Sequence, residues 1–335
     1  MTTNEYFKQL LKEISLGLED DERKMIEEKQ NTLREAMREE LPLVDDFLTG
    51  SYPRHTIIKP NGDEKFDVDV FVAFNNDDYG ETDLADLRKM VVSALEKIKK
   101  DKPDLGITKI KNTQRRSVCV EFDNDFQIDV VPAIEITEGK LYKIFDKKTL
   151  KAVKSNPKLH GALLSEANTT TGEMLVPIIR LLKSWKRDKC DYVKSFHLEL
   201  LAVEILGNEK IETYAKGMAK FFANASSKLE KACLKDPANN EYYIDTYLDD
   251  DKNRKKLLDL VASENKQAQE ARELEDSGEN DKAVEAWKNI FEDPDLETAK
   301  DIESGNFYPG AGGVRIGSDR NNHEERIKSP SSWGI

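Results

Sequence analysis

Hydrophobic and polar positions along the chain change their period more than once. Within the first forty residues, apolar side chains recur at helical spacing, beginning with Phe7, Leu10 and Ile14, and predict helices that end before Pro42. Residues 66–74 alternate instead, which predicts a strand with its even-numbered apolar residues on one face. The polar cluster at residues 75–78 ends this strand, and helical spacing returns at residues 84–98.

Two further strands are predicted at residues 117–122 and 126–131, and the short connection between them favours a hairpin. Beyond residue 157 the pattern is helical, with a long charged helix at residues 252–275 and a last helix that carries Trp287. Strands followed by helices indicate an α+β protein, with a sheet-bearing lobe before a helical lobe. We expect lobes at residues 1–165 and 166–303, followed by a flexible Gly-, Ser- and Asn-rich tail at 304–335.

Composition narrows the possible partners. The 335 residues carry a formal net charge of −13 and are 35% charged, which argues against a large duplex-DNA surface. No apolar run reaches the roughly 18 residues of a membrane span, and the first residues do not resemble a signal peptide. Cys119, Cys190 and Cys233 stand far apart, which indicates a reducing cytoplasm and no zinc site.

Carboxylates on strands are the sharpest chemical signal. Alternation places Asp67 and Asp69 on the same strand face, about 7 Å apart along the chain. Such a pair suits Mg²⁺, although a polar strand face without a metal is an open alternative. Asp129 on a later strand offers a third carboxylate, and Gly50 and Ser51 upstream offer a close backbone approach and a hydroxyl for phosphate oxygens.

Several motifs, taken together with these aspartates, resemble those of a known protein family. The residues that carry the resemblance are GSYPRHT at 50–56, FDVDV at 66–70, SVCVEF at 117–122, IDVVPA at 128–133, SNPKLH at 155–160, LKSW at 182–185 and KSFHLEL at 194–200. Together they resemble the bacterial cGAS/DncV-like nucleotidyltransferases (CD-NTases) of the polymerase β-like nucleotidyltransferase superfamily. The resemblance covers roughly residues 40–292, and it implies a nucleotidyltransferase palm, a mixed sheet with flanking helices, beside a helical lobe.

The resemblance also implies an activity and roles. Family members join nucleoside triphosphates and close the product into a cyclic second messenger, which in bacteria serves anti-phage signalling. By this likeness Asp67, Asp69 and Asp129 would bind two Mg²⁺ ions, and Asp129 would help activate the attacking hydroxyl. The other implied substrate contacts are Gly50 and Ser51 for the donor triphosphate, Lys183 and Ser195 for its phosphates, and Phe196 for a base.

Each of these residues also has a plainer interpretation. Lys183 alone would be a surface lysine, Ser195 an ordinary helix N-cap and Phe196 part of the helical core. The Arg115–Arg116 pair could face a substrate groove or simply be solvated. The four histidines lack metal-ligand spacing and are interpreted as structural or surface residues. The glycines at 310–313 lack a preceding strand and a following helix, so they fit a tail better than a phosphate loop.

Regulation and rival functions stay open at this point. The animal relative cGAS has a zinc-binding insertion that grips DNA, and this chain has no Cys/His cluster, so we expect no duplex-DNA activation. A protein partner that binds the tail is one possible regulator. The alternatives to a cyclic di- or trinucleotide synthase are an enzyme that adds nucleotides to an RNA end or a protein, and an inactive scaffold of the same fold.

Overall fold

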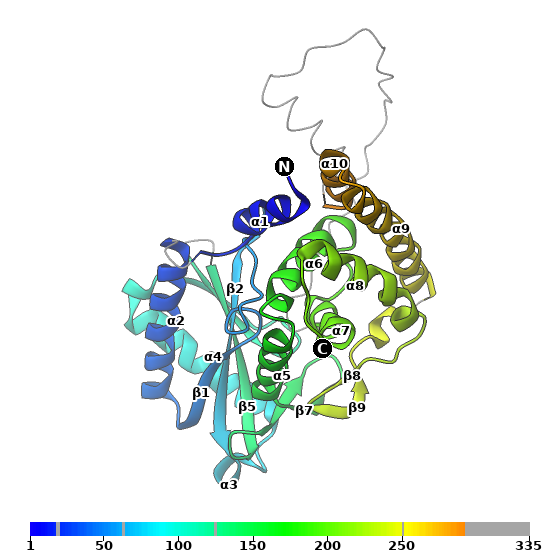
Figure 1. The fold of residues 1–335 in the computed structure, drawn as a ribbon. Coiled ribbons are helices and arrows are strands. Elements are labelled where there is room, and N and C mark those ends of the chain that lie inside the picture. Colours follow the sequence, from blue (N-terminus) through cyan, green and yellow to red (C-terminus); the bar gives the residue numbers. More distant parts are fainter. Residues whose placement is uncertain (18–20, 62–63, 124–125, 250, 292–335) are drawn as a thin grey trace, which may run out of the picture.

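The structure, a computed structural model, describes residues 1–17, 21–61, 64–123, 126–249 and 251–291. A sheet-bearing lobe lies beside a helical lobe (Figure 1). This arrangement confirms the predicted α+β class. The tail predicted at 304–335 lies outside the described residues. Within the described part, no helix is both long and apolar enough to cross a membrane.

The sheet brings the predicted strands together around two central ones. Its order is β1-β2-β5-β4-β3, and β6 and β7 continue from the second half of β5. The central strands β2 and β5 run parallel, whereas β4 and β5 form the predicted antiparallel pair. The strands are β1 (Leu43–Thr49), β2 (Phe66–Asn75), β3 (Ile107–Lys111), β4 (Val118–Phe122), β5 (Phe126–Thr137), β6 (Leu141–Asp146) and β7 (Lys151–Ser155).

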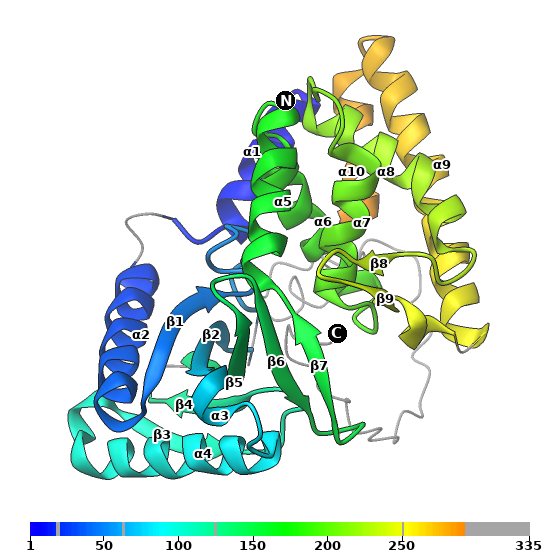
Figure 2. The ribbon, with the colours of Figure 1, turned by 90° about the horizontal axis from the view of Figure 1, so that it is seen from below.

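Alternation on β2 and β5 separates two faces of the sheet. On one face, α2 (Asp21–Glu40) and α4 (Leu84–Asp101) pack over Val68, Val70 and Ile128 in the larger core of this lobe (Figure 2). On the other face, Phe71 and Val131 join a smaller apolar cluster. Asp67, Asp69 and Asp129 share the parity of this second face, as the alternation predicts.

The helical lobe has its own core, and α1 (Thr3–Ile14) packs into it. Phe7 is fully buried, and its ring centroid lies 5.1 Å from that of Trp287 on α10 (Asn280–Phe291). The two helices lie side by side in Figure 1. The core therefore divides differently from the boundary expected at residue 165, because α1 supplies apolar side chains to the helical lobe.

Other elements complete the helical lobe. A two-stranded sheet, β8 with β9, accompanies its helices. These elements are α5 (Pro157–Thr170), α6 (Leu175–Lys189), α7 (Ser195–Leu206), α8 (Tyr214–Leu229), β8 (Lys235–Asp236), β9 (Asn239–Tyr243) and α9 (Asp251–Asp276). Short elements elsewhere are the helix α3 (Asn76–Tyr79) and the 3₁₀ turns Pro103–Leu105 and Thr246–Leu248.

Candidate active site

Three aspartates meet where β2 and β5 run side by side. The parallel register pairs Asp69 with Asp129, and Asp67 precedes Asp69 by two positions on the same strand face. One carboxylate oxygen from each of the three side chains lies within 4.8 Å of the others. Asp69 is 1% exposed and Asp129 is fully buried. The side chains that the sequence singled out therefore form one cluster, called the carboxylate triad below.

The chemistry of this donor set fits a hard divalent cation. Three carboxylates this close repel one another, and a bound cation relieves that repulsion. Oxygen ligands are those that Mg²⁺ takes in proteins, usually together with substrate phosphates. Ser117, next to the start of β4, donates a hydrogen bond of 3.0 Å from its hydroxyl to Asp129 Oδ2. This contact orients the buried carboxylate of Asp129.

Gly50 brings backbone against the triad. It follows β1 directly, and β1 pairs Thr49 with Asp69. Its φ is +74°, and a Cβ at this position would lie only 1.8 Å from Asp69 Oδ2. Both the backbone conformation and the close approach require glycine here. Ser51 follows, 8% exposed, so the predicted Gly-Ser pair is adjacent to the carboxylates.

Lys183 is not the surface lysine of the plainer interpretation. It lies on α6 and is 7% exposed. Its ammonium donates to the carbonyl of Thr56 at 3.0 Å and to Glu199 Oε1 at 3.2 Å. Burial lowers the pKa of Lys183, an effect that Glu199 opposes. The contact with Thr56 places this helical-lobe cation at the loop that begins with Gly50.

Sequence reasoning assigned no role to Glu199 or Arg54, which form the centre of a buried group. Arg54 Nε donates to Glu199 Oε2 at 2.9 Å, and the hydroxyl of Thr56 donates to Glu199 Oε1 at 2.8 Å. Burial by itself raises the pKa of Glu199, but Arg54 and Lys183 outweigh it and hold that pKa at about 2. The signal for this group was present, since Glu199 interrupts the apolar sequence of α7.

The start of α7 differs from expectation in two respects. Ser195 is the first helical residue rather than the N-cap, because the cap position belongs to Lys194, which makes no side-chain capping bond. Phe196 is 6% exposed, with its ring centroid 4.9 Å from that of His160 and 5.6 Å from the Arg54 guanidinium carbon. The ring belongs to the helical core, so this placement does not support stacking on a base.

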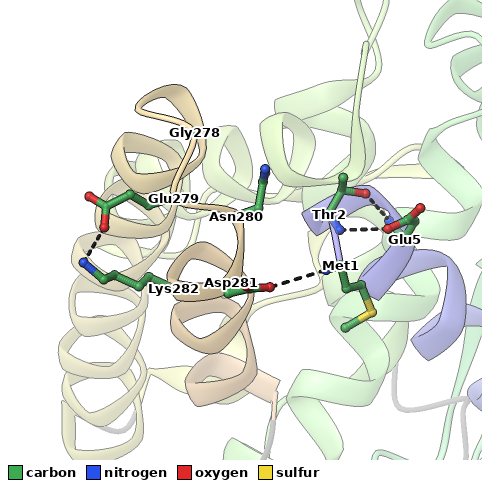
Figure 3. Close-up of a pocket in the computed structure, with 8 residues that line it drawn as sticks. All are labelled: Met1, Thr2, Glu5, Gly278, Glu279, Asn280, Asp281 and Lys282. Carbon is green, nitrogen blue, oxygen red and sulfur yellow. Dashed lines mark hydrogen bonds and ion pairs between the residues drawn. The ribbon is translucent and has the colours of Figure 1, made fainter.

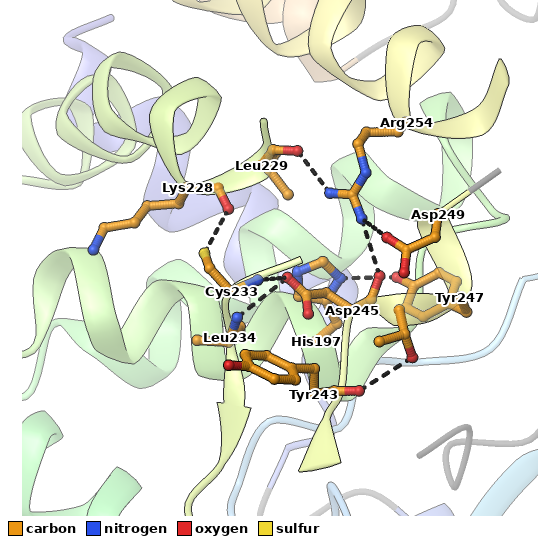
Figure 4. A network of polar contacts seen from close by, with 11 residues as sticks. His197, Lys228, Leu229, Cys233, Leu234, Tyr243, Asp245, Tyr247, Asp249 and Arg254 are labelled. Carbon is orange, nitrogen blue, oxygen red and sulfur yellow. Dashed lines mark hydrogen bonds and ion pairs between the residues drawn. The ribbon is translucent and has the colours of Figure 1, made fainter. Parts of the chain in front are cut away.

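A polar network within the helical lobe holds the start of α7 in place. The hydroxyl of Tyr247 accepts from the backbone N–H of Lys194 at 2.9 Å. The same hydroxyl contacts His197 Nδ1 at 2.9 Å (Figure 4). Burial lowers the pKa of His197 to about 3, which keeps its ring neutral. Asp245 accepts from the backbone of Cys233 and Leu234 in the same network. His197 is therefore structural, as the lack of metal-ligand spacing indicated.

One surface pocket lies away from the triad. It is a notch between the start of α1 and the turn that joins α9 to α10, with Glu5, Glu279 and Asp281 in its wall (Figure 3). The amino group of Met1 pairs with Asp281 at 3.3 Å across this notch. The acidic wall and its distance in the fold from β2 and β5 separate it from the triad.

Comparisons with known proteins agree with this geometry. A profile described as "Second Messenger Oligonucleotide or Dinucleotide Synthetase domain" (SMODS) matches residues 1–168. The chain belongs to the SMODS family. This match confirms the resemblance to bacterial CD-NTases that the motifs indicated. The matched range, residues 1–168, includes all three aspartates of the triad.

Curated relatives carry names from the same group. Cyclic AMP-AMP-AMP synthase of Acinetobacter sp. is 29% identical over 217 residues, which are 61% of this chain and 59% of that protein. CBASS oligonucleotide cyclase CdnC of Escherichia coli is 26% identical over 201 residues, 57% of this chain and 62% of the relative. These alignments span less than two thirds of each relative's own length.

Solved structures share the fold. E. coli MS115-1 CdnC with ATP gives a TM-score of 0.67 at 18% identity, covering 87% of this chain and 98% of that one. The CdnC:HORMA-deltaN complex gives 0.66 at 19% identity, with coverage of 86% and 96%. Vibrio cholerae DncV cyclic AMP-GMP synthase with the linear intermediate pppA(3′,5′)pG gives 0.58 at 15% identity, with coverage of 87% and 86%. At these identities the likeness concerns the fold.

Proposed function

We propose that this chain joins nucleoside triphosphates and closes the product into a cyclic di- or trinucleotide second messenger. The observation that carries the proposal is the carboxylate triad, whose ligand atoms lie within 4.8 Å of one another beside Gly50. Membership of the SMODS family and the names of the curated relatives support the same chemistry. The substrates would be ATP and a further nucleoside triphosphate.

The proposed reaction is nucleotidyl transfer. A ribose hydroxyl of one nucleotide attacks the α-phosphorus of a donor triphosphate, so that an O–P bond forms and the bond from the α-phosphorus to the bridging oxygen breaks. Pyrophosphate leaves, and the hydroxyl proton passes to Asp129. For a dinucleotide, a second transfer with the triphosphate of the linear intermediate as the donor closes the ring and releases another pyrophosphate. A trinucleotide requires one further transfer of the same kind before the ring closes.

Asp67, Asp69 and Asp129 would hold two Mg²⁺ ions. Bound there, the ions would neutralise the charge that develops on the entering and leaving oxygens. The chain's own residues then bind and orient the nucleotides, which is the larger part of the protein's task in phosphoryl chemistry. The all-oxygen donor set of the triad and the burial of Asp69 and Asp129 support this assignment.

Donor phosphates would lie between the two lobes. We assign them to the backbone at Gly50, the hydroxyl of Ser51, Lys183 and Ser195. An ammonium has three protons, and Lys183 gives two of them to Thr56 and Glu199, which leaves one for a phosphate oxygen. Ser195 begins a helix, and the N–H groups of a first turn attract anions. Phe196 is left out, because its ring is buried in the core.

We further propose a role in bacterial anti-phage signalling, under control of a partner protein. One structural neighbour is described as a CdnC complex with a HORMA protein, which supports a protein regulator here. The predicted tail at 304–335 is our candidate for its attachment. Deletion of residues 305–335 should abolish co-purification of that partner, and unchanged co-purification would overturn the tail's role.

One experiment tests the main proposal. The purified chain is incubated with all four nucleoside triphosphates and Mg²⁺, and phosphatase-resistant products are identified by mass spectrometry. We expect a cyclic oligonucleotide, which Asp67→Ala abolishes and Asp86→Ala preserves, because Asp86 is an exposed partner of Lys89 on α4. Labelling of added RNA without a small product would favour an RNA-end enzyme. No activity together with no Mg²⁺ binding would favour a scaffold.

A further inference from the structure

A buried arginine lies on α4, the helix that covers the sheet face opposite the carboxylate triad. Arg88 occupies a core position of this helix, between Leu87 and Val91, and is 3% exposed. The apolar residues of the same stripe pack into the larger core of the sheet-bearing lobe. A charged side chain in such a stripe loses its hydration when the lobe folds, so contacts within the chain must replace the lost water.

The guanidinium of Arg88 contacts the connection between β3 and β4. Its Nη2 donates to the backbone carbonyl of Gln114 at 2.9 Å and to that of Ser117. Its Nε donates to the side-chain oxygen of Asn112. Arginine suits this task because its planar fork holds several donors in fixed directions. One side chain of α4 therefore fixes three points of residues 112–117, the segment that leads into β4.

The strand β6 holds the same segment at a further point. Arg115 and Arg116 both pair with Asp146, at 2.6 Å and 2.9 Å. The backbone N–H of Lys147 donates to the carbonyl of Arg115 at 2.9 Å. The arginine pair that the sequence singled out thus uses its charges within the chain. The segment is anchored on both α4 and β6 before the chain reaches Ser117.

Ser117 joins these contacts to the triad. It is fully buried, its carbonyl accepts from Arg88, and its hydroxyl donates to Asp129 Oδ2 at 3.0 Å. The strand register explains this reach. Cys119 on β4 lies opposite Asp129 on β5, so Ser117, two positions earlier, is the diagonal neighbour of Asp129 on the same sheet face. Hydrogen bonds therefore run from α4 through Ser117 to a carboxylate of the triad.

The charge of Arg88 also relates it to Asp129. Within the ranges that the structure describes, Arg88 forms no ion pair with a carboxylate, and its Nη1 has no hydrogen-bond partner. Burial lowers the pKa of Arg88, and the charge of Asp129 opposes this effect. A buried cation without a direct ion pair is costly to the fold. Near the triad, however, its charge offsets part of the repulsion among the carboxylates.

We propose that Arg88 is a positioning residue, which acts through Ser117 to hold the Asp129 carboxylate in the orientation that binds a divalent cation. The presence of a cation at the triad rests on the proposed function, whereas the contacts from Arg88 to Asp129 rest on the geometry described above. Substituting a residue that orients a metal ligand commonly costs about 10–100-fold in metal affinity. If Arg88 only closed the turn before β4, its loss would lower stability and leave metal affinity unchanged.

The test uses Mn²⁺ as the probe, titrated into the full chain without nucleotide and followed by the electron paramagnetic resonance signal of the free ion. We expect Arg88→Met and Ser117→Ala each to weaken Mn²⁺ binding by about 10-fold. Lys89→Met is the matched control for a lost cation of α4, since the side chain of Lys89 is 73% exposed and pairs with Asp86. Ser93→Ala controls for a lost hydroxyl, because Ser93 is an exposed residue of the same helix. Both controls should bind Mn²⁺ as the wild type does.

A double-mutant cycle separates positioning from a general loosening of the fold. If Arg88 acts through Ser117, the variant that carries both substitutions should bind Mn²⁺ about 10-fold more weakly than the wild type, as each single variant does. Independent effects would instead multiply to about 100-fold. No Mn²⁺ binding by the wild type, wild-type affinity in either single variant, or effects that multiply would overturn the proposal. Melting curves confirm folding, and Arg88→Lys, which keeps the charge without the planar fork, replaces Arg88→Met if that variant does not fold.

Failure of this inference and failure of the proposed function are distinguishable, because Mn²⁺ binding involves no nucleotidyl transfer. A chain that binds Mn²⁺ with the expected coupling between Arg88 and Ser117 but makes no oligonucleotide would overturn the function and leave the positioning role standing. A chain that makes the cyclic product while Arg88→Met and Ser117→Ala bind Mn²⁺ as the wild type does would overturn the positioning role alone.

Discussion

Two groups of charges adjoin the loop that begins at Gly50, and their charges are arranged in opposite ways. The carboxylate triad gathers three negative charges within 4.8 Å. The second group surrounds Glu199 with Arg54 Nε at 2.9 Å, Lys183 Nζ at 3.2 Å and the Thr56 hydroxyl at 2.8 Å. The Glu199 group alternates charges of opposite sign, whereas the triad concentrates one sign. The triad therefore fits the proposed role as a cation site, whereas the Glu199 group has its counter-charges within the chain itself.

The two groups also differ in what they contact. Glu199 and Lys183 belong to α7 and α6, while Arg54 and Thr56 belong to the loop that begins at Gly50. The Glu199 group thus joins the helical lobe to the loop, and Gly50 in turn lies against Asp69. The Glu199 group therefore holds the loop in position, and the loop in turn contacts the carboxylate triad. Substitutions in the two groups should consequently separate activity from stability.

Asp69→Asn in the triad should reduce activity strongly. Asparagine keeps the shape but removes a charge that would hold the metal, so product formation should fall by roughly 10³-fold or more. In EDTA the melting temperature should stay the same or rise, because two like charges repel less than three. Product assays and melting curves measure both. A large loss of stability would show that Asp69 is a structural ion rather than a metal ligand.

Glu199→Gln should instead lower the stability of the fold. It leaves Arg54 and Lys183 buried without their counter-charge, so the free energy of unfolding should fall by about 3–5 kcal/mol. Glu204→Gln on the same helix is the control, since its pair with Lys228 is 38% and 41% exposed and should change stability by under about 1 kcal/mol. Urea unfolding measures both variants. Equal effects of the two substitutions would remove the distinction between the groups.

The triad could be predicted from the sequence for a physical reason. A strand's period of two fixes the face of each side chain, so the DxD pattern at 67 and 69 and the later Asp129 announce a common face. Gly50 was likewise visible, because close backbone approach demands glycine. Period and residue type are local properties. They sufficed for the long strands β2 and β5 and for the amphipathic helices.

The rest depends on contacts that no local pattern encodes. Lys183 and Glu199 lie 16 positions apart, and Arg54 contacts Glu199 across 145 positions, so only the assembled lobes bring them together. The strands β3 and β7 escaped prediction because both are short and largely solvent-facing, which weakens their alternation. Phe196 had two interpretations in the sequence, a substrate contact or helical core, and in this structure its ring is 6% exposed and packs with the helical core.

The charge of Glu199 should also make the stability of the fold depend on pH, to a smaller extent. The pKa of Glu199 is about 2 in the folded chain against 4.5 as its ordinary value, because Arg54 and Lys183 outweigh the effect of burial. A lowered folded pKa stabilises the fold above the unfolded value, and this contribution, about 3 kcal/mol, is lost as the pH falls from 4.5 towards 2. Glutamine cannot titrate and lacks this dependence.

The difference in unfolding free energy between wild type and Glu199→Gln should therefore shrink by about 2 kcal/mol between pH 6 and pH 3. Asp146, whose pKa is also lowered to about 2, is present in both proteins, so its contribution cancels in the difference. Urea unfolding at the two pH values provides the measurement. A difference that stays constant would mean that Glu199 is not charged in the fold. The contrast between the paired charges of the Glu199 group and the like charges of the carboxylate triad would then be wrong.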